Sequence, residues 1–335
     1  AMEPEDWQPS VQEELADLFA PTLPNTILDF TELNNPILTK KRFIEAISEA
    51  LRQSMVLYPE LIIMGQDIAE YGGAFKVTEG FVQQFGKQRV RNTPICESAI
   101  VGAALGLSLE GIKSVMEMQF ADFVTVGFNQ IVNNLAKAHY RWGHAPNSVI
   151  RMPSGSGVGA GPYHSQSTEA WFTHVPGLKV VYPSNPIDAK GLLLAAFEDP
   201  NPVLFFEHKA LYRNISAEVP NGYYTTEIGK AEIVCSGDAL SIITYGAAVN
   251  WATQLADSSE YEIEVLDLRS LSPIDYEAIE ATVKKTNRVI VLQEDSMFGG
   301  IAGDISAYIS EHLFEYLDAP VRTLGAADLP AICLH

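Results

Sequence analysis

The run Leu61-Ile62-Ile63-Met64-Gly65 decides the fold class of this chain. It is too short for a helix and suits a strand that is buried on both faces. A helical pattern precedes it, with Thr39 as the expected cap and one apolar face formed by Phe43, Ile47, Ala50 and Leu51. An amphipathic helix followed by a short buried strand is typical of an α/β fold.

The same alternation continues on the C-terminal side of this run. Further strands are expected at 114–120, 149–152, 178–182 and 203–207, with helices at 97–109 and 185–198. Asn185 and Pro186 have the cap and first-turn proline of a helix start. After a turn-rich stretch at 214–226, a second series has strands at 241–245, 263–268 and 288–293 and helices at 247–256, 276–285 and 301–316. Short strands alternating with helices predict mainly parallel sheets, so we expect two doubly wound α/β domains, at 38–213 and 214–335.

The first 37 residues differ in composition from the rest. They contain several acids and prolines but no lysine or arginine, and one short amphipathic stretch at 11–19. This composition predicts an acidic linker or arm rather than a domain.

Charge and composition restrict the function. The 335 residues carry a net charge of -20, which argues against nucleic acid or an anionic membrane surface as a partner. No apolar run approaches the roughly 20 residues that would cross a bilayer. The three cysteines are far apart and are expected to be reduced thiols.

Two features are candidates for chemistry. Glycines are dense at 155–161, but Pro162 interrupts the pattern and no helix opens there, so a dinucleotide loop is not favoured. The stretch is either a mobile loop that carries His164 to an active site or a flexible surface loop. Glu97 opens a helix rich in Ala and Gly, where an acid in the first turn also interacts favourably with the helix dipole. Taken alone, Glu97 is therefore structural.

Taken together, several stretches resemble one family. In the same order, they are similar to the β subunits of thiamine-diphosphate-dependent 2-oxo acid dehydrogenases, of the pyruvate and branched-chain 2-oxoisovalerate types. This family is built from transketolase-like pyrimidine-binding and C-terminal domains. The stretches are 65–75, 93–97, 117–123, 164–167, 176–181, 188–192, 267–271 and 284–286. The resemblance extends from about residue 38 to residue 330.

The resemblance implies roles for particular residues. Glu97 matches the glutamate that exchanges a proton with the pyrimidine ring of the cofactor, and His164 matches a loop histidine near the reacting thiazolium carbon. Ile95, Gln119 and Phe123 match other positions of the cofactor pocket. In the family, backbone carbonyls hold a potassium ion, expected beneath the His164 loop, and Asp199 and Asn201 match two of these metal positions.

The resemblance also implies partners. No Gly-Asp pair continues as the family's magnesium motif, so an α chain or domain is expected to hold Mg²⁺ and the diphosphate. A lipoyl acyltransferase core and self-association are further expectations, as is a cytoplasmic location, or the mitochondrial matrix in a eukaryote. The stretch 164–167 favours a branched-chain substrate, with pyruvate as the alternative.

The chain departs from the family in three places. Asn92 stands where relatives usually have aspartate, and residues 1–37 resemble no β-subunit start but could be the tail of a fused α half. Relatives continue well beyond the motif at 328–330, so the second domain is expected to lack its final elements. Transketolase, deoxyxylulose-phosphate synthase and a non-catalytic subunit remain alternative identities.

Overall fold

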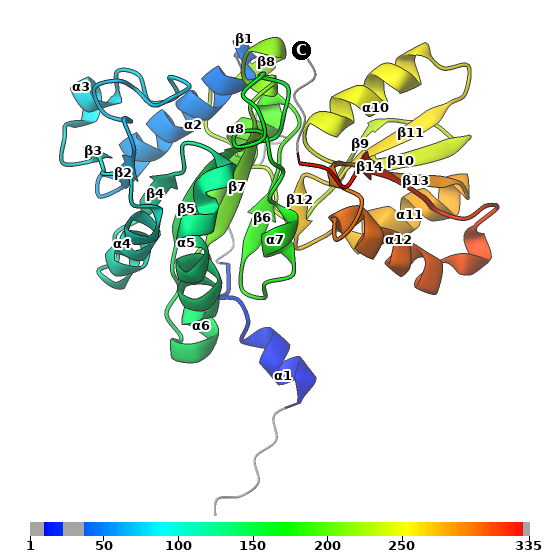
Figure 1. Cartoon of the computed structure of the whole chain (residues 1–335), viewed down its shortest axis with the longest axis horizontal. Coiled ribbons are helices and arrows are strands. Elements are labelled where there is room, and N and C mark those ends of the chain that lie inside the picture. The colour runs from blue at the N-terminus through cyan, green and yellow to red at the C-terminus, as the bar shows by residue number, and fades with distance from the viewer. Residues whose placement is uncertain (1–9, 23–36, 331–335) are drawn as a thin grey trace, which may run out of the picture.

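The computed structural model describes residues 10–22 and 37–330. Its first α/β unit is built on a seven-stranded sheet of order β12-β6-β7-β5-β4-β2-β3 (Figure 1). Neighbouring strands are parallel except for the antiparallel edge pair β12–β6. The strands are β2 (Ile62–Gly65), β3 (Val90–Asn92), β4 (Ser114–Glu117), β5 (Ser148–Ser154), β6 (Lys179–Val181), β7 (Val203–His208) and β12 (Ser270–Ser272).

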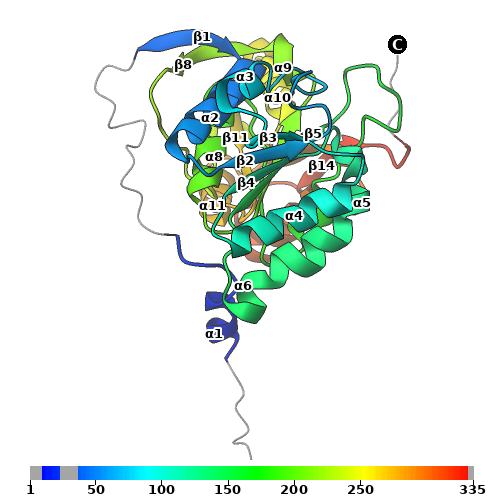
Figure 2. The same ribbon diagram turned by 90° about the vertical axis from the view of Figure 1, so that its left-hand side faces the viewer.

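Helices cover both faces of this sheet. Successive residues of its central strands point to opposite faces, and the residues on both faces are apolar. In β7, Val203 and Phe205 belong to one buried cluster, and Leu204 and Phe206 to the other. The first cluster includes α2 (Phe43–Leu57), α3 (Phe81–Phe85), α8 (Pro186–Glu198) and α9 (Leu211–Asn214). The second includes α4 (Glu97–Leu109), α5 (Val124–Asn129), a π-helix at Gln130–Leu135, α6 (Ala136–Trp142) and α7 (Ala170–Thr173). In Figure 2, α2 lies above the sheet, and α4, α5 and α6 lie below it.

The second α/β unit has a five-stranded sheet of order β14-β13-β10-β11-β9, in which only β9 is antiparallel. Its strands are β9 (Glu232–Cys235), β10 (Leu240–Thr244), β11 (Ile263–Asp267), β13 (Val289–Ser296) and β14 (Arg322–Ala326). Its helices are α10 (Ala247–Ser258), α11 (Tyr276–Thr286) and α12 (Ile301–His312), and a short 3₁₀ turn lies at Phe314–Tyr316. Another 3₁₀ turn, at Ala121–Phe123, belongs to the first unit. Two doubly wound units with mainly parallel sheets confirm the predicted fold class.

The start of α2 differs from the prediction. Thr39 does not cap this helix, because it lies in β1 (Leu38–Arg42), which pairs antiparallel with β8 (Ser216–Pro220). The N-cap is Arg42, whose backbone N–H donates to the Glu45 carboxylate. The β1–β8 pair also crosses the expected domain boundary at residue 214, and the exact boundary stays a prediction.

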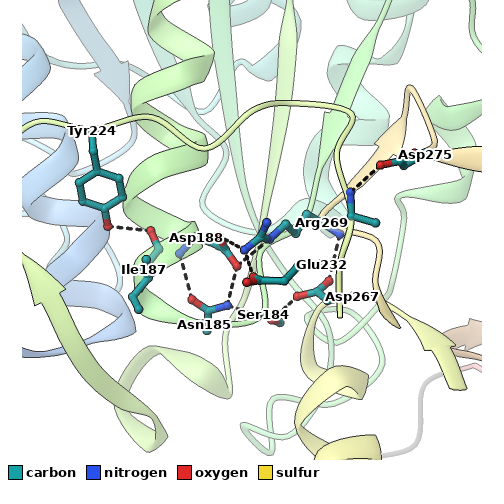
Figure 3. A network of polar contacts seen from close by, with 10 residues as sticks. Ser184, Asn185, Ile187, Asp188, Tyr224, Glu232, Asp267, Arg269 and Asp275 are labelled. Atoms are coloured by element: carbon teal, nitrogen blue, oxygen red, sulfur yellow. Dashed lines mark hydrogen bonds and ion pairs between the residues drawn. The ribbon is translucent and has the colours of Figure 1, made fainter. Parts of the chain in front are cut away.

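A buried polar network joins the two units (Figure 3). Arg269 follows β11 and binds both carboxylate oxygens of Asp188 in α8, at 2.9 and 2.8 Å. At the end of β11, Asp267 accepts a 2.5 Å hydrogen bond from the hydroxyl of Ser184. The contact between the units is therefore polar and specific as well as apolar.

The described part of the N-terminal segment packs on the first unit. It contains α1 (Val11–Ala16), which falls within the amphipathic stretch noted at 11–19 and is capped by the hydroxyl of Ser10. Ala20 exchanges two backbone hydrogen bonds with the side chain of Asn201, at 2.8 and 3.0 Å. Residues 1–9, 23–36 and 331–335, which include Cys333, lie outside the described residues. Within residues 10–22 and 37–330, no helix is both long enough and apolar enough to cross a bilayer.

Candidate active site at the carboxyl edge of the first sheet

The topology of the first sheet creates a crevice beside β2. From β2 the chain passes to β3 on one side, and β4 then pairs with β2 on the other side. In such sheets, ligands bind outside the carboxyl ends of the strands, at the point where the strand order reverses. That point lies between the ends of β2 and β4.

The predicted catalytic and cofactor residues gather at this edge. Ile95 and Glu97 follow β3, Gln119 and Phe123 follow β4, and His164 follows β5. Because β5, β4, β2 and β3 are neighbouring parallel strands, the segments after them share one edge of the sheet. The sheet therefore brings together residues that are up to 69 positions apart in the sequence.

Glu97 is the first residue of α4, and its side chain is only 5% exposed. The side-chain amide of Gln66, which follows β2, donates a 2.8 Å hydrogen bond to Oε1 of Glu97. The other oxygen, Oε2, has no hydrogen-bond partner among the described residues. A buried carboxyl group with one oxygen held and one free is suited to exchange a proton with a ligand in the crevice.

His164 lies against two aromatic rings. The centroid of its ring is 4.8 Å from that of Phe120 and 5.4 Å from that of Phe123, and both contacts are edge-to-face. The loop that carries His164 has left-handed backbone at four glycines, Gly155, Gly157, Gly159 and Gly161. Its far end is held because Asp122 accepts hydrogen bonds of 3.1 Å from the backbone and the side chain of Gln166.

The other predicted pocket residues are more exposed. Ile95 is 83% exposed beside the buried Glu97, whereas Gln119 and Phe123 are half-buried. Phe123 contacts His164, but within the described residues no hydrogen bond, ion pair or ring contact links Glu97 to Gln119, Phe123 or His164. The structure places the five residues at one edge without bringing all of them into contact.

Asp199 and Asn201 lie elsewhere. They precede the amino end of β7, whereas His164 follows the carboxyl end of β5, and the two strands are parallel over residues 149–154. That span alone is roughly 17 Å long. The expectation that a potassium ion at Asp199 and Asn201 lies beneath the His164 loop is therefore wrong.

The side chains at that turn are already engaged. Asp199 binds the ammonium group of Lys179 and accepts hydrogen bonds of 2.9 Å from the backbone and the side chain of Asn201. The amide oxygen of Asn201 accepts from the backbone of Ala20. These side chains do not fit as metal ligands, so an ion bound by backbone carbonyls of the turn stays a prediction.

A buried cluster of charged side chains lies within the first sheet, close to its carboxyl edge. Arg151 in β5 donates to Glu117 at the end of β4 (2.5 Å) and, through two nitrogens, to Glu207 in β7 (2.7 Å each). Burial raises the pKa of Glu117, and the neighbouring Arg151 opposes this shift. The cluster ties together three neighbouring strands, β4, β5 and β7, and the segments after β4 and β5 carry site residues. Over residues 10–22 and 37–330, no three His, Cys, Asp or Glu side chains are grouped as a metal centre would require.

Sequence reasoning missed four residues of this region: Gln66, Phe120, Asp122 and Glu294. The first three fall within the stretches at 65–75 and 117–123 that carry the family resemblance, and membership of these stretches was the usable signal. Glu294 had no such signal, because it reaches the loop from the other α/β unit.

Comparison with known proteins agrees with this geometry. Residues 39–214 match the family described as "Transketolase, pyrimidine binding domain", and residues 229–332 match "Transketolase, C-terminal domain". The chain is 44% identical to the 2-oxoisovalerate dehydrogenase subunit beta of Bacillus subtilis, over 87% of this chain and 90% of that protein. It is 41% identical to the pyruvate dehydrogenase E1 component subunit beta of Staphylococcus aureus, over 85% and 89% of the two chains.

Among solved structures, the fold resembles a chain described as "Split gene transketolase, inactive beta4 tetramer". The TM-score is 0.70 at 22% identity, covering 86% of this chain and 88% of the other. This likeness concerns the fold alone. The sequence matches, by contrast, show that the chain belongs to the family of 2-oxo acid dehydrogenase β subunits, built from transketolase pyrimidine-binding and C-terminal domains.

Proposed function

We propose that this chain is the β component of a 2-oxo acid dehydrogenase complex. It takes part in the thiamine-diphosphate-dependent oxidative decarboxylation of a 2-oxo acid and the transfer of the acyl group to a lipoyl group. The observation that carries the proposal is the buried Glu97 at the sheet crevice, with Oε1 held by Gln66 and Oε2 without a hydrogen-bond partner in the described part of the chain.

Each site residue has a proposed task. Glu97 exchanges a proton with the pyrimidine ring through Oε2, while Ile95, Gln119 and Phe123 line the ring. When bound, the cofactor supplies the nucleophilic carbon and stores the electrons released by decarboxylation. His164, held between Phe120 and Phe123, transfers a proton at the reacting centre or meets the lipoyl group.

The described residues fit only the pyrimidine half of the cofactor. The diphosphate and its magnesium ion require carboxylate and amide oxygens, which we assign to an α subunit or α domain. The exposed side chain of Ile95 beside the buried Glu97 supports a site that is completed by another chain. Self-association and docking on a lipoyl acyltransferase core belong to the same proposal, as does a location in the cytoplasm or mitochondrial matrix.

A branched-chain substrate is favoured over pyruvate. The stretch 164–167 supports this choice, and relatives of both types have similar identity to this chain.

Reconstitution with the α partner tests the proposal. Release of carbon dioxide from 2-oxoisovalerate and from pyruvate is measured for the wild type, Glu97→Gln and Glu110→Gln. We expect Glu97→Gln to lower the rate roughly 10²-fold or more, because the amide cannot cycle a proton. Glu110 is exposed at the other end of α4 and serves as the control. Near-normal turnover of Glu97→Gln would refute the assignment.

Calorimetric titration tests the shared site. The isolated chain should bind thiamine diphosphate and magnesium only weakly, and the α–β complex should bind them tightly. Tight, stoichiometric binding to this chain alone would contradict the interface model.

A further inference from the structure

Glu294 in β13 reaches across from the second α/β unit to the start of the glycine-rich loop. Its Oε1 accepts hydrogen bonds from both the backbone N–H and the hydroxyl of Ser156, each at 2.8 Å. Its Oε2 lies 2.5 Å from Nε2 of His208, at the end of β7. One carboxylate thus joins two segments of the first unit to the second.

The direction of the His208 contact follows from its other nitrogen. Nδ1 of His208 accepts a 3.2 Å hydrogen bond from the backbone N–H of Ala210. A neutral imidazole with Nδ1 as acceptor carries its proton on Nε2, so His208 donates to Glu294. The contact therefore does not require a charged histidine.

The backbone of the loop is shaped around this contact. Gly155 has a φ of +79°, and a Cβ added there would lie 2.2 Å from Nε2 of His208. Only glycine lets the chain pass this close to His208 in that conformation. The loop then continues to His164 and closes where the Gly155 N–H donates to the carbonyl of Gln166, at 3.1 Å.

Charge and burial make the contact strong. The side chain of His208 is 2% exposed and that of Glu294 is 15% exposed. Burial would raise the pKa of Glu294, but the hydrogen bond from His208, the positive charge of His208 when it is protonated, and the hydrogen bonds from Ser156 outweigh burial and lower this pKa to about 2. Glu294 therefore remains ionised, and hydrogen bonds to an ionised acceptor are stronger than those between neutral groups.

The same residues form part of a cavity of about 750 Å³ between the loop and the second unit. Ser156 and Glu294 line it together with Tyr163, Ser165 and Trp171. Tyr163 and Ser165, which flank His164 in the sequence, therefore face the same cavity as Ser156 and Glu294.

We propose that Glu294 is a positioning residue for His164: through Ser156 and His208, it fixes the start of the glycine-rich loop to the second unit. Asp122 fixes the far end through Gln166. The consequence for catalysis rests on the proposed function, whereas the consequence for the loop does not.

Hydrogen exchange of residues 155–166 tests the loop directly. Glu294→Ala should speed exchange in this segment about tenfold or more, because a charged hydrogen-bond acceptor for Ser156 is lost. Asp295→Ala is the matched control: it removes a neighbouring acid that accepts a hydrogen bond from the backbone N–H of Ser296 rather than from the loop. Unchanged exchange in Glu294→Ala, or equal acceleration in both variants, would overturn the proposal.

Ser156→Ala keeps the proposal testable if Glu294→Ala fails to fold. It removes one donor and keeps the backbone N–H, so the same segment should exchange faster than in the wild type but more slowly than in Glu294→Ala. Wild-type exchange in Ser156→Ala, with Glu294→Ala unfolded, would count against the proposal.

A double-mutant cycle in the reconstituted complex tests the link to His164. Glu294→Ala should lower the rate about tenfold in the wild-type background and change it little in the His164→Ala background, because both act through one group. An equal loss in both backgrounds would overturn the positioning role. A wild-type complex without decarboxylase activity would instead refute the proposed function. The hydrogen-exchange experiment would still test whether Glu294 holds the loop.

Discussion

The side-chain amide of Gln66 donates a 2.8 Å hydrogen bond to Oε1 of Glu97, and both side chains are buried. An amide NH₂ group can donate to a carboxyl oxygen but cannot accept its proton. A proton on Glu97 therefore sits on Oε2, the oxygen that has no partner in the described protein. Gln66 decides which oxygen of Glu97 is available for proton exchange.

Replacing Gln66 by glutamate should disturb this arrangement. Two carboxyl groups at hydrogen-bond distance raise the pKa of one of them, since like charges so close do not both ionise easily. In Gln66→Glu we expect the acidic limb of the decarboxylation pH profile to move up by about one unit, with roughly a tenfold loss of rate at neutral pH. The pH dependence of kcat/KM checks this. Gln83→Glu, at an exposed position of α3, is the control, and identical profiles for the two variants would contradict the role of Gln66.

Asp267 should make stability depend on pH (Figure 3). It is fully buried at the contact between the units, and burial, with the nearby charge of Asp188, raises its pKa from 3.8 to about 7. The folded state holds this proton more tightly than the unfolded state, so stability falls as pH rises from about 4 to about 7 and is then constant.

Asp267→Asn removes this dependence. Between pH 5 and pH 8 the wild type should lose about 2 kcal/mol more free energy of unfolding than the variant does. Urea unfolding at the two pH values measures the difference. Equal losses in the two proteins would mean that Asp267 titrates normally in the fold.

Removal of Arg151 should be severe. Arg151→Met leaves the carboxylates of Glu117 and Glu207 buried without their cation, and we expect a loss of about 3–5 kcal/mol in the free energy of unfolding. Lys284→Met is the comparison, because its ion pair with Glu280 is exposed to solvent and should contribute far less to the free energy of unfolding. Chemical denaturation of both variants decides whether the buried cluster holds the strand ends together.

Two glycines with left-handed backbone should respond differently to alanine. At Gly177 (φ +92°) an added Cβ would lie 1.9 Å from the carbonyl oxygen of Ala136, whereas at Gly143 (φ +68°) it would meet nothing within 4 Å. Gly143→Ala should cost only the backbone strain, about 1 kcal/mol. Gly177→Ala must also displace the start of α6, so we expect at least about 2 kcal/mol more. Similar thermal unfolding midpoints for the two variants would show that the start of α6 can shift without a loss of stability.

Local features of the sequence were sufficient for the element types and for part of the site. Asn185 and Pro186 start α8 as predicted, since the side chain of Asn185 accepts from the N–H of Asp188 and Pro186 needs no hydrogen-bond partner in the first turn. The alternation of short apolar strands and helices predicted the two doubly wound units. Glu97 and His164 were chosen because they stand in the stretches that resemble the family.

The pairing of distant segments was not accessible in this way. The local pattern predicts Thr39 as a helix cap, but Thr39 pairs with Val219 in a strand. A local pattern carries no information about a partner 180 residues away. Likewise, nothing around Asp199 indicates that it lies at the opposite end of the sheet from His164, because that depends on which strands are neighbours and on their direction.

The sequence by itself therefore determined the main helices, the central strands of both sheets, the fold class and the resemblance to the family. These depend on apolar periodicity, capping groups and short motifs, which act over a few residues. Only the tertiary structure placed Gln66 against Glu97 and brought Glu294 to Ser156 and His208. Contacts of this kind depend on strand order and on the docking of the two units, where the geometry of the whole chain decides which polar groups meet.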